Sequence, residues 1–421
     1  MQPNLKLKYA AIVVVLLSGP FCVPANAALS LDKAEAIALK QDPVVSRLAA
    51  ESRSLSEQSI ADGQWKDPRL KLGLIAIPTD SFDLNQENMT QQQIGFQQII
   101  PRGDSLALKQ SQTRSKAEQK NRKMDLERQT IRRDVRLAYL DVVYQKQAYG
   151  IVKKSKLFFE QLEEIAQFRY SSGKEKKQLI LEASLTHSRM EDRLLKITDM
   201  EKKARAKLSK WVGNGAAFEE ILPVFPEFDD LPDQEVMHNR LSSHPAIRVA
   251  EAKINTRSIG VQLAKEQYKP AWMADATYGR RQDSSMGRSR ADLLSVMVSI
   301  DLPLFTKNRQ DRVHNAQRIE VEAAQYERDD KLRMLESQLE INRLNLEWTL
   351  SRIKLFSFKL MPEALNYTQT TLTGYQSGVT DLTAVVRAHL AELTVRLDRL
   401  KLQHTERASH AKLLYLIGEQ E

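Results

Sequence analysis

The segment Tyr170-Ser171-Ser172-Gly173 returns as Tyr375-Gln376-Ser377-Gly378, 205 residues further along the chain. Pro101 has a counterpart in Pro303 at an offset of 202 residues, which is nearly the same spacing. Matches spread over both halves at one nearly constant offset indicate a duplicated unit, whose copies are placed equivalently. We therefore expect two halves of the same structure, with a small insertion between the second proline and the second tyrosine.

The first 27 residues have the pattern of a secretory signal peptide. Lys6 and Lys8 carry positive charge, residues 10–17 are apolar, and Ala25-Asn26-Ala27 is a small-x-small cleavage site. We therefore expect cleavage after Ala27. The apolar run is shorter than the ~20 residues of a membrane-spanning helix, so a retained anchor is the less favoured alternative.

The single cysteine, Cys22, lies inside this segment. Lipidation of this cysteine needs small residues before it, whereas Pro20 and Phe21 stand there. We therefore favour plain cleavage and a mature chain without cysteine, which excludes disulfides and thiolate metal sites.

The chain is basic, with a formal net charge of +9, of which +7 stays after Lys6 and Lys8 are removed. In a cytosolic protein this excess would suggest a nucleic-acid partner. An exported protein meets no nucleic acid, so we assign the charge to solvated helix faces and predict no nucleic-acid partner.

Four segments alternate between apolar and polar residues with the period of a β-strand. They span about residues 69–77, 92–100, 271–279 and 293–302. A length of about nine to eleven residues is what a tilted strand needs to cross a bilayer. The side chains that we expect to face lipid are Trp272, Tyr278, Val296, Val298 and Ile300. The alternative for each pair is a soluble hairpin with one face buried on a core.

A long segment with helical spacing follows each pair of strands. Residues 104–167 and 308–369 contain only Pro362 as a proline, and each would reach ~90 Å as an unbroken helix. Apolar residues recur in steps of three and four, which is the spacing of coiled coils. The first segment has two such stripes, which favours a wall of helices laid side by side; one wide face on a bundle is the alternative.

Gly173 and Gly378 supply the positive φ that commonly ends a helix, so a second helix returns after each of them. We divide the chain into a signal peptide (1–27), a first repeat (28–213), a linker (214–240) and a second repeat (241–421). Each repeat is predicted to contain a helix, two strands and a long helical hairpin, over about residues 104–212 and 307–417.

Four strands are too few to close a membrane barrel, because the smallest closed barrels have about eight. Several chains must therefore pool their strands, and three chains would supply twelve around a water-filled interior. The strand faces expected to line this interior are polar, and include Gln97, Asp275, Thr277, Ser295, Ser299 and Asp301. The sequence thus predicts an exported, oligomeric conduit.

The chain resembles the TolC-like outer membrane factors, the exit ducts of Gram-negative tripartite efflux pumps and type I secretion systems. The matching features are Asp42-Pro43 with its echo His244-Pro245, the strand exit at residues 97–103, and the doubled Tyr-x-x-Gly. The resemblance covers essentially the whole mature chain. It implies a mainly α-helical protein with membrane β-structure, in which long helical hairpins form a trimeric α-barrel in the periplasm. The four strands of each chain would contribute to a 12-stranded trimeric barrel in the outer membrane.

The same resemblance implies partners and a contact site. The partners are two further copies of the chain, outer membrane lipid, a periplasmic adaptor (membrane fusion) protein and an inner-membrane transporter, with the RND type as one candidate. The periplasmic tip that contacts the adaptor would consist of Tyr170, Gly173, Tyr375 and Gly378. Ordinary turn chemistry is the alternative reason for these residues.

Many relatives narrow this tip with acidic side chains after the second glycine, and those positions are not acidic here. We therefore take Asp381 and Glu182 as a candidate gate, with Lys177 or Arg387 as ion partners. A ring of like charges in a narrow pore sets ion preference. The alternative for Asp381 is stabilisation of a helix N-terminus.

The chain lacks the Gly-rich phosphate loop, the nucleophile elbow and the helical metal-binding pair of enzymes, so we predict no enzyme, no cofactor and no resident metal. The predicted function is a passive exit duct for efflux. Residues 101–104 are similar to those of family members that serve heavy-metal pumps, but drug efflux is equally compatible. A type I protein secretion duct and an exported coiled-coil scaffold without a pore are the alternatives.

Overall fold

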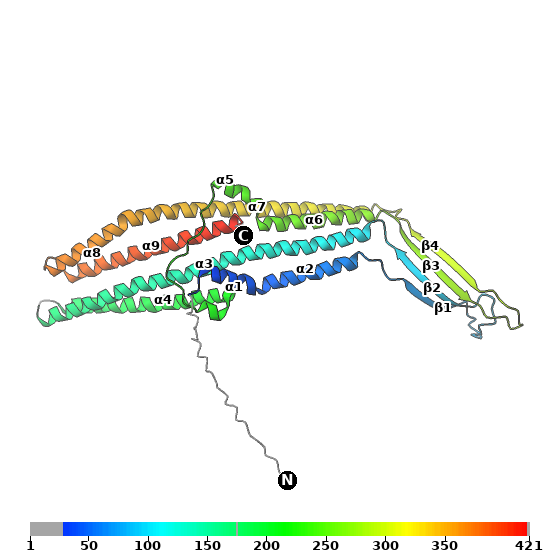
Figure 1. Ribbon diagram of the computed structural model, residues 1–421, viewed down its shortest axis with the longest axis horizontal. Coiled ribbons are helices and arrows are strands. Elements are labelled where there is room, and N and C mark those ends of the chain that lie inside the picture. The colour runs from blue at the N-terminus through cyan, green and yellow to red at the C-terminus, as the bar shows by residue number, and fades with distance from the viewer. Residues whose placement is uncertain (1–27, 174–175, 419–421) are drawn as a thin grey trace, which may run out of the picture.

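The computed structural model describes residues 28–173 and 176–418. A long helical body carries a four-stranded sheet at one end (Figure 1). The predicted combination of long helical hairpins with four strands is confirmed. The predicted signal peptide and its cleavage site at Ala27 lie outside the described residues.

From α2 and α6 onwards, both halves contain a helix, two strands and a long helical hairpin in the same order. The first half consists of α1 (Leu31–Gln41), α2 (Pro43–Asp62), β1 (Arg69–Ile75), β2 (Gln91–Ile100), α3 (Ser105–Ser171) and α4 (Lys177–Ala217). The second consists of α6 (Pro245–Glu266), β3 (Ala271–Arg280), β4 (Leu293–Asp301), α7 (Gln310–Leu355), η1 (Phe356–Leu360), α8 (Met361–Gln376) and α9 (Leu382–Leu416). A short helix between them, α5 (Gln234–Leu241), was not expected from the sequence.

The two repeats differ at the exit from their second strand. Pro101 lies four residues before the start of α3, whereas Pro303 lies seven residues before the start of α7. This difference of three residues equals the change in the repeat offset from 202 to 205. A second difference is η1, a π-helical turn that interrupts the second long helix just before Pro362. Its counterpart α3 runs unbroken for 67 residues.

The Asp-Pro and His-Pro pairs that echo each other begin equivalent helices. The Asp42 carboxylate accepts hydrogen bonds from two first-turn amides of α2, at 2.7 and 3.0 Å. The Nδ1 atom of His244 accepts one from a first-turn amide of α6, at 3.1 Å. Pro43 and Pro245 occupy the first helical position, where a missing N–H costs nothing. The repeated motif is therefore a helix N-cap in both halves.

The long helices form a single layer (Figure 1). Near the sheet, the order of packed neighbours is α2, α3, α6, α7; towards the hairpin turns it is α4, α3, α9, α8. Val142 of α3 belongs to a core cluster shared with α1 and α4, and Phe159 to one shared with α4 and α9. The helix α3 therefore has neighbours on both sides, as its two apolar stripes predict.

Polar contacts replace apolar packing between the helices near the sheet. Ser115 of α3 and Thr256 of α6 share a buried hydrogen bond of 2.8 Å. Thr113 of α3 donates to Asp62 of α2 at 2.7 Å, and Lys109 pairs with the same carboxylate at 2.9 Å. The hydrogen bond from Lys109, followed by that from Thr113, lowers the pKa of Asp62 to about 2. The small side chains of Ser115, Thr256 and Thr113 allow the helices to approach closely at the end next to the sheet.

A polar joint connects the sheet to the helical layer at residues 101–104. Gly103 has a φ of +40°, and a Cβ there would lie 2.1 Å from Glu266 Oε2 of the other repeat. Glu266 accepts from the Asp104 amide at 2.8 Å and pairs with Lys269 at 2.7 Å. The glycine is therefore required by the close approach of the two repeats, which gives this segment a structural role.

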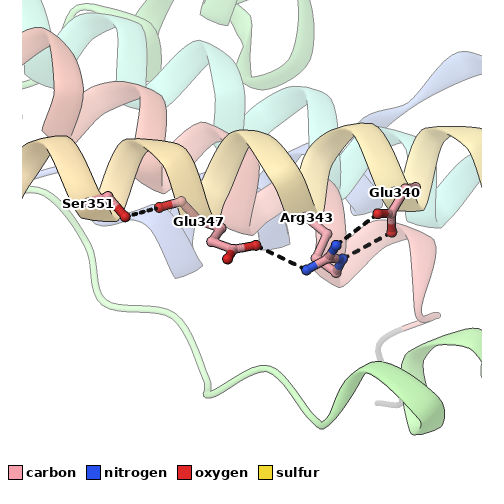
Figure 2. Close-up of polar contacts among 4 residues, drawn as sticks. All are labelled: Glu340, Arg343, Glu347 and Ser351. Carbon is pink, nitrogen blue, oxygen red and sulfur yellow. Dashed lines mark hydrogen bonds and ion pairs between the residues drawn. The ribbon is translucent and has the colours of Figure 1, made fainter.

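One side of α7 is held by ion pairs along the helix (Figure 2). The Arg343 guanidinium donates to both oxygens of Glu340, at 2.8 and 3.0 Å, and to Glu347 at 3.1 Å. These residues are three and four positions apart, where side chains of a helix meet. Exposed pairs of this kind each stabilise a helix by about 0.3–0.5 kcal/mol. They support a long helix along a side that has little apolar packing.

We expect His244 to make the stability of the protein depend on pH. Burial lowers the pKa of His244 to about 4, although its Nε2–H donates to the Tyr415 carbonyl at 3.2 Å. The unfolded chain, with an ordinary pKa of about 6.5, therefore binds more protons than the folded chain between these values. The stabilising contribution is complete above pH ~6.5 and is lost as the pH falls towards 4.

The measurement is the thermal unfolding midpoint of detergent-solubilised protein at about pH 7.5 and about pH 5. His244→Asn keeps a side chain that caps helices well, so this variant should lose less stability on acidification than the wild type. His238→Asn is the matched control because His238 is exposed. Equal losses in all three proteins would contradict the role of His244.

Candidate functional site

The four strands form one antiparallel sheet in the order β1-β2-β3-β4. The central pair, β2 with β3, joins the two repeats, and its register places Gly95 opposite Thr277. In the described residues, β1 and β4 each have a strand neighbour on one side only. The sheet is therefore continuous across the duplication and has two open edges.

One face of this sheet is apolar and bare. The register places Ile100, Trp272 and Ile300 in one row across β2, β3 and β4. The next rows on the same face carry Val298, Val296 and Tyr278, and Val296 is 72% exposed. All five side chains predicted to face lipid are exposed and share this face. Within the described residues this face is not buried on a core, whereas a soluble hairpin would bury it.

The opposite face is polar and is tied across three strands. Lys71 of β1 forms an ion pair with Asp275 of β3, reaching over Gly95 of β2. Asp275 also accepts from Thr277 at 2.9 Å. A Cβ at Gly95 would lie 2.6 Å from Thr277 Oγ1. Because Gly95 has no side chain, there is room for this network. The alternating pattern alone does not reveal this role of Gly95.

The loops at the far end of the sheet are joined to each other. Arg290 donates to the Glu87 carbonyl at 3.1 Å, and Arg281 donates to the Asn88 carbonyl at 3.4 Å. The basic loop between β3 and β4 therefore packs against the loop between β1 and β2.

The two hairpin turns lie at the opposite end of the molecule (Figure 1). Gly173 and Gly378 have φ angles of +73° and +77°, as helix-ending glycines require. The equivalent tyrosines differ, since Tyr170 is 45% exposed whereas Tyr375 is 4% exposed. The Arg169 guanidinium lies 4.8 Å from the Tyr375 ring centroid and so connects the two hairpins. Only the first tyrosine is presented on the surface of the chain.

The four candidate gate residues have different surroundings. Asp381 accepts a hydrogen bond from the Ala384 amide at 2.8 Å and so caps the N-terminus of α9. Stabilisation of a helix N-terminus is the alternative to a gate role for this residue. Glu182 of α4 accepts from Thr383 of α9 at 3.0 Å and so bridges the hairpins of the two repeats. Lys177 and Arg387 are exposed. Within residues 28–173 and 176–418, neither of these two cations pairs with Asp381 or Glu182.

His389 is a further residue between the hairpins that the sequence did not single out. Its ring stacks on Phe158 at a centroid distance of 3.9 Å and meets Phe159 edge-on at 5.1 Å. Burial lowers the pKa of His389, with an opposing effect of Glu392. A neutral imidazole therefore packs here as an aromatic ring between α9 and α3.

The part of the chain that the structure describes has neither a metal-ligand cluster nor a bilayer-spanning helix. No three side chains of the His, Cys, Asp or Glu types come together there as metal ligands. None of the helices there combines the length and the apolar character of a bilayer-spanning helix.

We expect Gly95→Ala to destabilise the sheet, because the new methyl group would overlap Thr277 Oγ1. Overpacking of this kind costs about 1–3 kcal/mol, which would be measured as a lower thermal unfolding midpoint of the purified protein. Gly73→Ala is the control, since Gly73 lies in β1 on the same polar face and a Cβ there meets only Ile75 at 3.8 Å. Thr277→Ala should restore part of the loss; equal midpoints for both glycine variants would contradict the account.

The model of the outer membrane efflux protein family matches residues 236–419, which run from α5 to the end of α9. No curated protein matches the chain by sequence. Over its second half, the chain thus has the sequence pattern of this family.

Solved structures extend the likeness to both repeats. The outer membrane protein VceC of Vibrio cholerae is 16% identical with a TM-score of 0.76, over 92% of this chain and 96% of VceC. The CmeC outer membrane channel of Campylobacter jejuni is 12% identical with a TM-score of 0.74, over 99% and 94%. The MtrE outer membrane channel of Neisseria gonorrhoeae, in its open state, is 14% identical with a TM-score of 0.74, over 92% and 88%.

At these identities the solved structures show the fold, and the family model adds the sequence pattern of the second repeat. The resemblance predicted from the sequence is confirmed by both comparisons. The second repeat therefore has the sequence pattern of the outer membrane efflux proteins in residues 236–419, and the chain has the fold of outer membrane channels over about nine-tenths of its length.

Proposed function

We propose that the protein is the outer membrane exit duct of a tripartite efflux system and conducts its cargo passively. The observation that carries this proposal is the sheet with one bare apolar face, one polar face and two open edges. Such a sheet suits a wall between lipid and water. A coiled-coil scaffold without a pore has no need of it. The family model, whose description is outer membrane efflux protein, supports the location and the transport role.

The open edges argue for a homotrimer. Unpaired backbone N–H and C=O groups cost several kcal/mol each in hydrocarbon, so β1 and β4 need partners from other copies. Three chains bring twelve strands together, which is enough for a closed barrel with a wet interior. The polar network of Lys71 and Asp275 would then face this interior, and Trp272, Tyr278 and Val296 would face lipid.

The helical layer has apolar side chains at its two flanks as well. On α4 these are Leu181, Leu185 and Leu195, all exposed in the single chain. On the opposite flank, Trp348 of α7 and Phe358 of η1 are exposed, the latter by 83%. Apolar stripes at both flanks of one layer fit lateral packing of identical copies into an α-helical tube. We place this tube in the periplasm, below the strands.

The hairpin turns would then form the periplasmic tip of the tube. We assign contact with the adaptor protein to Tyr170, Gly173, Tyr375 and Gly378, of which Tyr170 is the exposed aromatic residue. The inner-membrane transporter, of the RND type or another class, would select heavy-metal or drug cargo before it reaches the duct. Asp381 begins α9 and Glu182 lies in the second turn of α4, both close to the hairpin turns, and we propose that they form the gate of this opening.

The direct test of the proposed function is the conductance of the purified protein in planar bilayers, together with its mass in detergent. A trimer that produces single-channel currents is the expected result. A stable monomer in the soluble periplasmic fraction, without conductance, would contradict the proposed function.

We expect Val296→Arg to prevent assembly in the membrane. A lipid-facing arginine at mid-depth costs about 2–4 kcal/mol, and Val296 lies on the apolar face. Ser295→Arg is the matched control because the neighbouring residue of a strand points to the opposite, polar face. The measurement is the yield of trimer in the outer membrane fraction. Equal yields for the two variants would contradict the assignment of the faces.

A second expectation concerns the tip. Gly378→Val strains a position with a φ of +77°, so the turn should be displaced while the distant strands still insert. In a strain whose drug or metal tolerance depends on this protein, tolerance should fall although the trimer yield is normal. Gly150→Ala, within helical α3 and facing open space, should leave tolerance unchanged. Full tolerance with Gly378→Val would remove the tip assignment.

A further inference from the structure

The helical layer is hollowed on one side near the sheet. The hollow has a volume of about 880 Å³ and is lined by residues of α2, α3, α6 and α7. These four helices lie side by side in that order, so α2 and α7 are the outermost members of this part of the layer. A single hollow that both of them line lies on the concave side of the layer.

The hollow is strongly basic. Seven of its lining side chains are Lys or Arg, and two are Glu. Lys116 and Lys123 of α3 and Lys331 of α7 are exposed and have no ion pair within the described residues. Three unpaired ammonium groups therefore face the solvent of one concave surface.

The other four cations of the hollow are paired. Arg47 and Lys120 share the carboxylate of Glu51. Lys253 pairs with Glu327, and Arg257 pairs with Glu320 at 3.3 Å. Four carboxylates, those of Glu51, Glu327, Glu320 and Glu127, therefore lie beside the seven cations. Three positive charges per chain stay uncompensated.

The opposite side of α3 carries charges of both signs. Arg122 lies between Glu118 at 2.8 Å and Asp125 at 3.8 Å. The helical period of 3.6 residues places these three side chains about opposite Lys116 and Lys123. Acidic and basic side chains thus alternate around Arg122, whereas Lys116 and Lys123 lie in a hollow whose charged lining is mostly basic.

We propose that the hollow is one third of a cationic belt on the inner wall of the duct, which attracts anionic cargo. This inference rests on the proposed function, since the concave side of the layer faces the lumen only when copies close into a tube. Three copies would place nine unpaired lysines around one water-filled passage. A passage lined by charge of one sign concentrates counter-ions and favours their transit. The belt therefore admits negatively charged solutes in preference to cations.

The test uses the full-length protein in detergent and a fluorescent pyrene trisulfonate as the anionic probe. The variant K116Q/K123Q/K331Q removes the three unpaired cations of the hollow. The matched control R53Q/R114Q/R333Q removes three exposed cations from the other sides of α2, α3 and α7, so both variants lose the same charge. Fluorescence anisotropy measures probe binding whether the tip is open or closed.

We expect the hollow variant to bind the trisulfonate at least about tenfold more weakly than the wild type, and binding to weaken as salt is raised. The control should bind within about twofold of the wild type. Equal binding by all three proteins, or an equal loss in both variants, would overturn the inference.

Planar-bilayer currents in a KCl gradient separate this inference from the proposed function. A chloride preference in the wild type that falls in the hollow variant alone supports the belt. Channels without anion preference would overturn the belt and leave the duct intact. Failure of all three proteins to form a trimeric channel would contradict the duct itself.

Discussion

Backbone hydrogen bonding at the open edges of the sheet is the constraint on which the rest of the structure depends. The strands β1 and β4 each present a row of donors and acceptors with no partner in the described chain. Water can satisfy such groups, but hydrocarbon cannot. The apolar face that carries Val296 and Trp272 is unsuited to water over the same length. In the proposed duct, pairing with other copies would reconcile the edges with the face and would make the four strands of a chain one part of a larger wall.

The duplication explains how one chain supplies both the membrane part and the helical body. Each repeat contributes one hairpin of strands and one hairpin of long helices, and β2 joins β3 where the repeats meet. The joint around Gly103 and Glu266 then fixes the sheet to the helical layer across the same boundary. At the other end, Glu182 and Thr383 link the two helical turns. The repeats are thus tied to each other at both ends.

Sequence periodicity predicts much of this fold, because buried and exposed side chains recur with the regular periods of strands and helices. The four strands follow a period of two over most of their length, and the stripes of α3 match its two rows of neighbours. The short helix α5 was missed since its eight residues lie in a Pro-rich linker. The π-helical turn η1 was missed because one irregular turn leaves the apolar pattern of α7 nearly unchanged.

The candidate functional residues could be predicted only in part from the sequence. Helix-ending glycines have a local cause, so Gly173 and Gly378 are recognisable from their neighbours. By contrast, the pair of Lys71 and Asp275 joins residues 204 positions apart, and it depends on a glycine in the strand between them. The difference between Tyr170 and Tyr375 likewise depends on which hairpin approaches the other. Such contacts follow from the tertiary arrangement, which no local pattern encodes.

Pairing of β1 with β4 of another copy is the central claim, and short-range cross-linking tests it most directly. Within one chain, β1 and β4 are separated by three strand spacings, or about 14 Å. A bismaleimide with a reach of about 8 Å cannot bridge this distance. A Cys22→Ser chain with Leu72→Cys and Val296→Cys would be treated in intact cells and separated in denaturing gels. The account predicts dimers and trimers and no larger species, with at most dimers from each single-cysteine chain. Monomers alone, from protein that is present in the outer membrane, would contradict it.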